Sequence, residues 1–275
     1  MKNYEDLTFA DSFMFGKVTM NQEICKELCD TLTGQDMGEI KESQREKFIA
    51  HSKVSKYVKL DMYAQNTGGE VVDAEMQNRL DGVRASELPL RIRYYQGMID
   101  QEILNSGQAY RNLKDVYIIF ICTFDPFGKG LYRYSFQHIC KELPGLELDD
   151  KIHWILYNTK GDTSNAPKGI RDFLAYIENG KVSSSLTEMI DKEVVQARIN
   201  EEWRLEYMKS FTHDMDIRRE GYDEGLEAGM KVGHINGAIS VYRETGQSDD
   251  QIINTIISKF NLSREDAISL VRESK

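Results

Sequence analysis

The feature that most constrains the fold is an unbroken run of apolar and aromatic residues, Val116-Tyr117-Ile118-Ile119-Phe120-Ile121-Cys122. Successive side chains of a strand point to opposite faces, so a strand with no polar position must be covered on both faces. A helix is predicted before this run, over Glu87 to Asn105, and Gly107 ends it. The sequence therefore predicts an α/β fold built around a central buried strand.

The segments around that strand alternate between helical and extended patterns. Apolar spacing predicts a helix over Phe9 to Leu32, with Gly34 as its stop signal. Asn66-Thr67-Gly68-Gly69 is typical of a hairpin turn between two strands. The predicted strands besides the central one are Phe48 to Val54, Tyr57 to Gln65, Val71 to Gln77, Leu131 to Gln137 and Ile152 to Tyr157.

The C-terminal third is helical and charged from about Ile170 onward. We expect a core of residues 1–180, a charged helical connector of residues 181–237 and a small helical module of residues 238–275. In the connector a glycine recurs every fourth residue from Gly221 to Gly237. On a helix this spacing leaves room for a partner helix, although each glycine costs about 1 kcal/mol against alanine. A flexible connector and the pairing of two chains through these helices both stay open.

The composition argues against two classes of protein. The chain is 40% hydrophobic and 29% charged, which is typical of a soluble globular protein. No apolar run approaches the ~20 residues that span a bilayer, and the N-terminus has no hydrophobic signal core. We therefore expect a cytoplasmic protein without a membrane partner. The four cysteines lack the spacing of a zinc site, and reduced, mostly buried thiols are the simpler interpretation.

The charge is distributed unevenly. A net charge of −10 opposes nonspecific binding to nucleic acid, because such binding depends on neutralising phosphates. Residues 41–59 are the exception, with six cations against two anions. This basic segment either docks a DNA duplex or forms an ordinary solvated strand face.

Two neighbouring predicted strands carry acidic residues on matching faces. In Leu60-Asp61-Met62-Tyr63-Ala64 and in Val72-Asp73-Ala74-Glu75-Met76-Gln77, alternate apolar residues define one face of each strand. Matching these faces across a Thr67-Gly68-Gly69 loop places Asp61 opposite Glu75. The pattern therefore predicts two carboxylates side by side, with an amide one step further along.

Adjacent carboxylates repel each other unless a positive group lies between them. Mg²⁺ is a suitable partner, because it takes one or two protein carboxylates together with water and phosphate oxygens. An ion bound there can activate water and neutralise the charge that develops in phosphodiester cleavage. A surface hairpin with ordinary polar residues explains the same spacing, so the spacing alone leaves both interpretations open.

Asp61 and the Glu75-x-Gln77 tripeptide, in a helix, three strands, helix, strand order, resemble the core of PD-(D/E)XK nucleases, which have a restriction-endonuclease-like fold. More narrowly, residues 5 to 230 resemble the recombination-promoting nuclease and transposase family (Rpn-like). The resemblance implies a mixed sheet flanked by helices, followed by a C-terminal helical extension. The stretches that carry it are Leu7-Thr8-Phe9-Ala10-Asp11-Ser12-Phe13-Met14-Phe15, Lys59-Leu60-Asp61, Ala74-Glu75-Met76-Gln77, Arg93-Tyr94-Tyr95 and Ile119-Phe120-Ile121-Cys122-Thr123-Phe124-Asp125-Pro126-Phe127.

This resemblance implies a Mg²⁺-dependent DNA endonuclease, with Mn²⁺ as a substitute, linked to recombination and mobile elements. Asp61 and Glu75 would be the metal ligands, and Gln77 would be catalytic. The superfamily commonly has a lysine at the position of Gln77, where it orients water or steadies the phosphate, and glutamine brings no positive charge. Asp11 matches a position where the superfamily often has a further acidic residue near the metal. Its alternative role is that of a helix N-cap.

A different class of function also fits the sequence. The absent lysine and the net acidity suit a nuclease fold that is catalytically weak or inactive and only binds DNA or a protein. Arg91 and Arg93, on the helix after the hairpin, either contact the DNA backbone or form a solvent-facing side of that helix. Cleavage assays separate the two classes.

Overall fold

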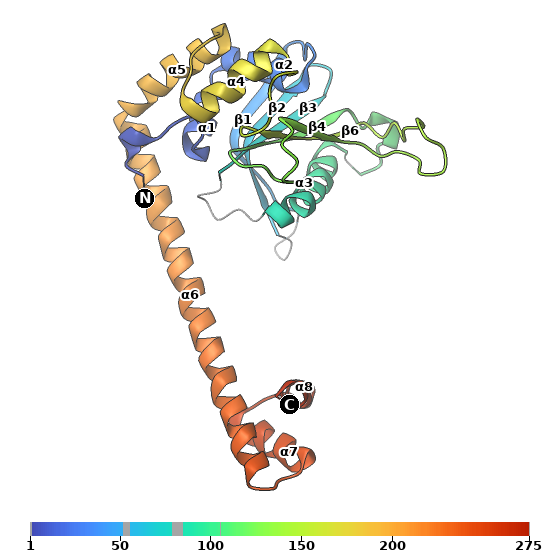
Figure 1. Ribbon diagram of the computed structural model, residues 1–275, viewed down its shortest axis with the longest axis vertical. Coiled ribbons are helices and arrows are strands. Elements are labelled where there is room, and N and C mark those ends of the chain that lie inside the picture. The colour runs from blue at the N-terminus through green and yellow to red at the C-terminus, as the bar shows by residue number, and fades with distance from the viewer. Residues whose placement is uncertain (1, 52–55, 79–84, 105, 275) are drawn as a thin grey trace. The chain divides into compact units, whose positions relative to one another are not determined.

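The structure is a computed structural model that describes residues 2–51, 56–78, 85–104 and 106–274. The chain forms two compact units, Met1–Leu205 and Glu206–Lys275. The first unit is an α/β domain with one six-stranded sheet between helices (Figure 1). The α/β class, the mixed sheet flanked by helices and the helical extension are therefore confirmed.

The sheet has the order β1-β2-β3-β4-β6-β5. Its β3–β4 and β4–β6 pairs are parallel, whereas the β1–β2, β2–β3 and β5–β6 pairs are antiparallel. Every residue of the central strand β4 is buried, as its apolar run predicts. The strands are β1 (Ile40–Ile49), β2 (Val58–Asn66), β3 (Val71–Gln77), β4 (Val116–Cys122), β5 (Arg133–Phe136) and β6 (Ile152–Asn158).

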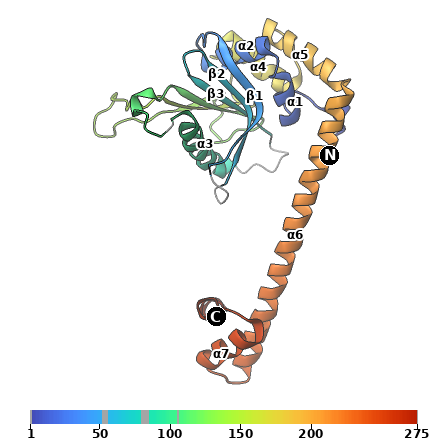
Figure 2. The same ribbon diagram turned by 180° about the vertical axis from the view of Figure 1, so that it is seen from behind.

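Helices cover both faces of the sheet in the first unit. The helix α3 (Leu88–Ile103) lies on one face, and α1 (Ser12–Val18), α2 (Gln22–Thr33), α4 (Lys168–Asn179) and α5 (Ser185–Arg198) lie on the other (Figures 1 and 2). Short 3-10 turns are present at η1 (Tyr4–Asp6), η3 (Ala85–Glu87) and η4 (Tyr110–Asn112). The apolar cluster under α3 is formed by its own buried residues and by those of the strands, among them Leu88, Ile92, Tyr95, Ile99, Val116, Ile118, Phe120 and Leu156.

Two sequence-based expectations about the N-terminal part are wrong. The single helix over Phe9 to Leu32 is in fact α1 and α2, because the Asn21 side chain accepts from the backbone N–H groups of Glu23 and Ile24 and starts a new helix. The strand expected over Phe48 to Val54 is β1, which ends at Ile49, and residues 52–54 lie outside the described residues. The charged residues of β1 hide its extent from a hydrophobic pattern.

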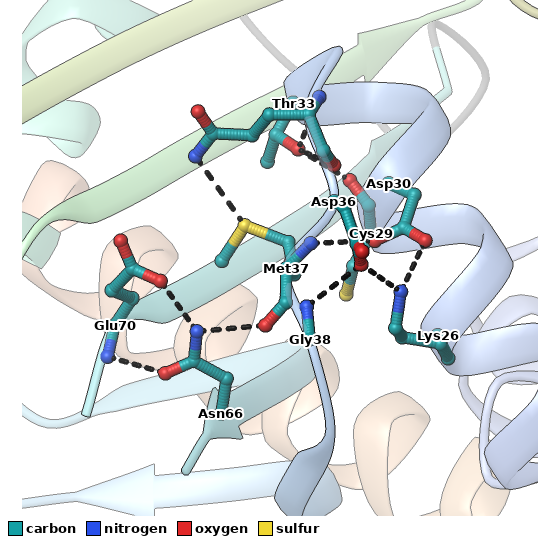
Figure 3. A network of polar contacts seen from close by, with 10 residues as sticks. Lys26, Cys29, Asp30, Thr33, Asp36, Met37, Gly38, Asn66 and Glu70 are labelled. Atoms are coloured by element: carbon teal, nitrogen blue, oxygen red, sulfur yellow. Dashed lines mark hydrogen bonds and ion pairs between the residues drawn. The ribbon is translucent and has the colours of Figure 1, made fainter. Parts of the chain in front are cut away.

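A polar network fixes the turn end of the β2–β3 hairpin (Figure 3). The amide of Asn66 donates to the carbonyl oxygen of Met37 at 2.8 Å and to the Glu70 carboxylate, and its oxygen accepts from the Glu70 N–H at 2.9 Å. The Asp30 carboxylate in α2 accepts from the Met37 N–H at 2.9 Å. These bonds tie α2 to the hairpin and hold the register of β2 and β3 from the end opposite Asp61 and Gln77.

The second unit is helical. It contains the greater part of α6 (Glu201–Glu244), together with α7 (Asp249–Phe260) and α8 (Arg264–Glu273). Ser248 and Ser263 cap α7 and α8 through their side chains. A small apolar core joins the three helices through Ile235, Ile239, Ile252, Ile256, Ala267 and Val271. The structure divides the chain after residue 205, and the three-part division expected from the sequence stays a prediction.

The glycine stripe lies on α6. At each of these glycines, from Gly221 to Gly237, an added Cβ would meet nothing within 4 Å. Among the residues that the structure describes, no helix combines the length and the apolar character that a bilayer crossing requires.

Gly161 should tolerate no side chain. A Cβ at Gly161 would lie 2.4 Å from the carbonyl carbon and oxygen of Leu131, which are backbone atoms and cannot rotate away. We expect Gly161→Ala to lower the free energy of unfolding by about 1–3 kcal/mol or more. The matched control is Gly97→Ala in α3, where a Cβ meets nothing within 4 Å and where alanine should stabilise the helix by about 0.5–1 kcal/mol. Urea denaturation measures both; equal stability of the two variants would contradict the contact.

Candidate active site

The β2–β3 register brings Asp61 and Glu75 together. Met62 pairs with Ala74 and Tyr63 with Asp73, which is the register expected from the apolar faces. Beyond Met62 and Ala74, the carboxylates of Asp61 and Glu75 accept hydrogen bonds from backbone N–H groups of the opposite strand. The Asp61 N–H donates to Glu75 Oε1 at 2.8 Å, and the Met76 N–H donates to Asp61 Oδ2 at 3.1 Å. Each acidic side chain is therefore fixed by the backbone of the opposite strand.

Asp73 is a third carboxylate that the sequence reasoning missed. It alternates with Glu75 on β3, so the two side chains share a face, and they are 0% and 2% exposed. Both carboxylate oxygens of Asp73 are buried and have no hydrogen-bond partner among the described residues. The two-residue spacing from Glu75 was the signal that could have revealed it.

The three carboxyl groups resist ionisation. Burial, opposed by the hydrogen bond from Met76 and by Lys59 and Arg91, raises the pKa of Asp61 to about 7. Burial, followed by repulsion from Asp61, raises the pKa values of Asp73 and Glu75 well above their ordinary range. A bound cation would reverse this effect, because an adjacent positive charge favours the ionised form of a carboxyl group.

Arg91 comes to this cluster from α3. Its Nη1 donates to Gln77 Oε1 at 2.8 Å, its Nη2 donates to the Tyr95 hydroxyl at 2.9 Å, and Nη2 lies 3.7 Å from Glu75 Oε2. Gln77, the last residue of β3, is 3% exposed. The structure therefore places Gln77 beside Glu75 but with its amide oxygen directed to an arginine.

The basic segment of the sequence lies mainly on β1 and at the start of β2. Arg45, Lys47 and Lys59 of this segment form ion pairs within the domain. Glu46 pairs with Lys59 and with Arg45, each at 2.9 Å, and Lys47 lies 3.6 Å from Glu42 and 3.9 Å from Glu102. Part of its positive charge is therefore balanced by neighbouring carboxylates, and Lys59, 42% exposed, is the cation of this segment nearest to Asp61 in the sequence.

The Asp11 carboxylate makes its hydrogen bonds to residues outside this group. It occupies the N-cap position of α1 without capping it through its side chain. Its carboxylate accepts from the N–H and hydroxyl of Thr8 at 2.8 and 3.0 Å and pairs with Lys2 at 2.8 Å. The structure brings together Asp61, Glu75 and Gln77 and leaves Asp11 with other partners.

The residues present fit a divalent cation. The described part of the chain contains no group of three or more histidine, cysteine, aspartate or glutamate residues arranged to hold a metal ion. Mg²⁺ needs fewer protein ligands, because it keeps several waters and takes one or two carboxylates. Asp61 and Glu75 offer such a pair, and the Asp73 carboxylate, which has no hydrogen-bond partner among the described residues, lies beside Glu75 on the same face.

Comparison with known proteins identifies the family. A family model described as PD-(D/E)XK nuclease family transposase matches residues 4–159, which include the whole hairpin, α3 and β4. No curated protein and no solved structure matches the chain. The family resemblance noted in the sequence is thereby confirmed.

Raising the pH should destabilise the metal-free protein between about pH 4 and about pH 7. The folded pKa values of these acids lie above the unfolded values of about 3.9 for Asp and 4.3 for Glu. The folded state therefore binds more protons in this range, and its free energy of unfolding falls as the pH rises.

Asp61→Asn should flatten this pH dependence, because asparagine keeps an oxygen that accepts from the Met76 N–H but does not ionise. Thermal unfolding with a chelator, followed across this pH range, measures the slope. A variant with the same slope as the wild type would show that Asp61 does not contribute to it.

Proposed function

This chain belongs to the PD-(D/E)XK nuclease family transposases, and we propose that it is a Mg²⁺-dependent DNA endonuclease in which Mn²⁺ can substitute. The observation that carries the proposal is a pair of hydrogen bonds, from the Asp61 N–H to the Glu75 carboxylate and from the Met76 N–H to the Asp61 carboxylate, which holds two carboxylates side by side on the hairpin. Such a pair has little stability without a cation. Nuclease membership supplies the reaction class, the hydrolysis of phosphodiester bonds.

Each residue has a role that follows from its position. Asp61 and Glu75 would hold the ion, and a divalent ion supplies an activated water and a counter-charge for the phosphate. The backbone N–H of Met76 and that of Asp61 fix the orientation of the two carboxylates. Gln77 can orient a neighbour through hydrogen bonds but brings no charge of its own. The transposase description of the family supports a role in recombination or in mobile elements, and a DNA substrate suits the cytoplasmic location expected from the sequence.

A nuclease fold that only binds DNA or a protein is the second candidate. The uncharged Gln77 and the net charge of −10 favour it, because both weaken the attraction of the site for a phosphodiester. Metal-independent DNA binding without cleavage under any divalent ion is the result that it predicts.

We also propose that two chains pair through the C-terminal helices. On α6 the open glycine positions adjoin exposed apolar side chains, Leu226 at 51% and Met230 at 56% exposure. Apolar side chains of this size, exposed on a helix with room for a neighbour, suit contact with a second helix. Two paired active sites would serve the cleavage of both DNA strands.

Removal of the C-terminal helices should therefore reduce the assembly to a monomer. We expect the full chain to have the mass of a dimer and the chain truncated after Met208 to have the mass of a monomer, measured by light scattering. Gly229→Leu in the full chain, which fills the stripe, should give the same change without shortening the chain. An unchanged mass in both variants would make α6 a passive connector.

Asp61→Ala and Glu75→Ala should abolish DNA cleavage while leaving the fold intact. Wild type should nick a supercoiled plasmid at low salt with Mg²⁺ or Mn²⁺ and not with a chelator. Loss of a metal ligand removes the activated water, so we expect a reduction of at least about 10⁴-fold, the order found when a central catalytic group is removed. Circular dichroism controls for folding.

Asp11→Ala belongs in the same assay. Because Asp11 is bonded to Thr8 and Lys2, we expect a smaller loss than for either hairpin carboxylate. Equal nicking by wild type and both hairpin variants would place the activity elsewhere or in a contaminant. No nicking by the wild type would favour the binding module.

A further inference from the structure

The candidate site contains a positively charged side chain, but this side chain belongs to helix α3 and not to strand β3. Position 77 carries a glutamine, whose amide is neutral, at the end of β3 beside Glu75. The guanidinium of Arg91 on α3 occupies the adjacent space, 2.8 Å from Gln77 Oε1 and 3.7 Å from Glu75 Oε2. The positive charge missing from the strand is therefore present in the same cluster, delivered by a helix.

Arg91 is held in a defined orientation. It lies in the first turns of α3, and Tyr95, one turn further on, accepts a hydrogen bond from its Nη2 at 2.9 Å. Its Cζ lies 5.5 Å from the ring centres of Tyr95 and of Phe120 on β4. Anchored on three sides, its side chain is still 33% exposed. Rigid support with partial exposure is what a group needs to meet a substrate without reorganisation.

The guanidinium also keeps unused hydrogen-bonding capacity. It has five N–H donors in a planar fork, and within the described residues its hydrogen bonds go to Gln77 and Tyr95. The forked geometry matches the non-bridging oxygens of a phosphate, which it can bind in a bidentate manner. An exposed fork beside the metal-binding carboxylates is therefore suited to a phosphodiester held at that metal site.

We propose that Arg91 is a catalytic residue that contacts the non-bridging oxygens of the scissile phosphodiester, and that Gln77 is a positioning residue that holds Arg91 through its amide oxygen. The inference rests on the proposed nuclease function. It assigns to α3 the charge that a lysine at position 77 would supply. Gln77 acts through Arg91 and does not itself neutralise the phosphate.

A purely structural role for Arg91 makes a different prediction. If Arg91 only kept the buried carboxylates in place, its removal would disorder them and weaken metal binding. If it serves the phosphate, its positive charge, 3.7 Å from Glu75 Oε2, would also repel a metal ion bound by that carboxylate. Its removal would then leave Mn²⁺ affinity unchanged or increase it, while cleavage falls.

The first experiment compares Arg91→Ala, Arg91→Lys and Arg93→Ala in the full chain. We expect Arg91→Ala to lower kcat by about 10²–10³-fold, the loss found when one transition-state donor is removed. Arg91→Lys should recover part of this loss, because it keeps the charge but not the fork. Arg93 is exposed on the same helix, so Arg93→Ala removes one charge outside the cluster and should act on KM rather than kcat.

The second experiment replaces the positive charge of Arg91 on α3 by a lysine at position 77 on β3. Gln77→Lys combined with Arg91→Ala should restore at least about tenfold of the lost kcat, since a catalytic charge is restored at the neighbouring position. Gln77→Leu alone should lower kcat less than Arg91→Ala does, because it loosens the arginine without removing it. A double variant as inactive as Arg91→Ala would show that the charge is not what Arg91 contributes.

The third experiment is independent of activity. Isothermal titration of Mn²⁺ into metal-free wild type and Arg91→Ala should give equal or tighter binding in the variant, with thermal unfolding as the control for folding. Weaker Mn²⁺ binding by the variant, or cleavage equal to the wild type, would overturn the inference and leave the nuclease assignment standing. Absence of cleavage by wild type would overturn the proposed function, and this inference with it.

Discussion

The burial of acidic side chains close to one another is the constraint on which the rest of the site depends. Asp61, Asp73 and Glu75 lie on two paired strands, and the last two are nearly inaccessible to solvent. Acidic groups are seldom fully buried unless a partner compensates them. Here the hydrogen bonds from the backbone of the opposite strand compensate Asp61 and Glu75 only in part, and Asp73 has none among the described residues. The metal-free site therefore disfavours the ionised form of these carboxyl groups.

The surrounding strands and helix α3 hold these acidic side chains in place although their burial is unfavourable. Parallel pairing places β3, which carries Asp73 and Glu75, beside the fully buried β4. The network around Asn66 holds the hairpin register at the far end, and a slip of one residue would turn every acidic side chain to the other face. Packing of α3 over the same face contributes both the apolar cover and Arg91. The stability of the domain therefore supports an arrangement that is unfavourable by itself.

The features of the fold and the site that could be predicted from the sequence are those set by residues close together in the chain. The bounds of β3 and β4 and the opposition of Asp61 to Glu75 follow from side-chain alternation and turn chemistry, and all were predicted from the sequence. Asp73 obeys the same alternation and could have been included. The break between α1 and α2 depends on a single cap at Asn21, and apolar periodicity does not detect it. The contact of Arg91 with Gln77 joins a helix to a strand 14 residues away, which requires knowing how α3 packs.

Delivery of the positive charge by α3 has a consequence that a lysine on the strand would not have. A strand lysine would share the rigid backbone of Glu75, so its distance to the carboxylates would be fixed by the sheet alone. Arg91 depends instead on the packing of α3 against Phe120 and on the hydrogen bonds to Gln77 and Tyr95. Anything that shifts the start of α3 would move the guanidinium while Asp61 and Glu75 stay in place. Under the proposed mechanism, metal binding and phosphate binding would be carried by separate elements of the fold, and each could change without the other.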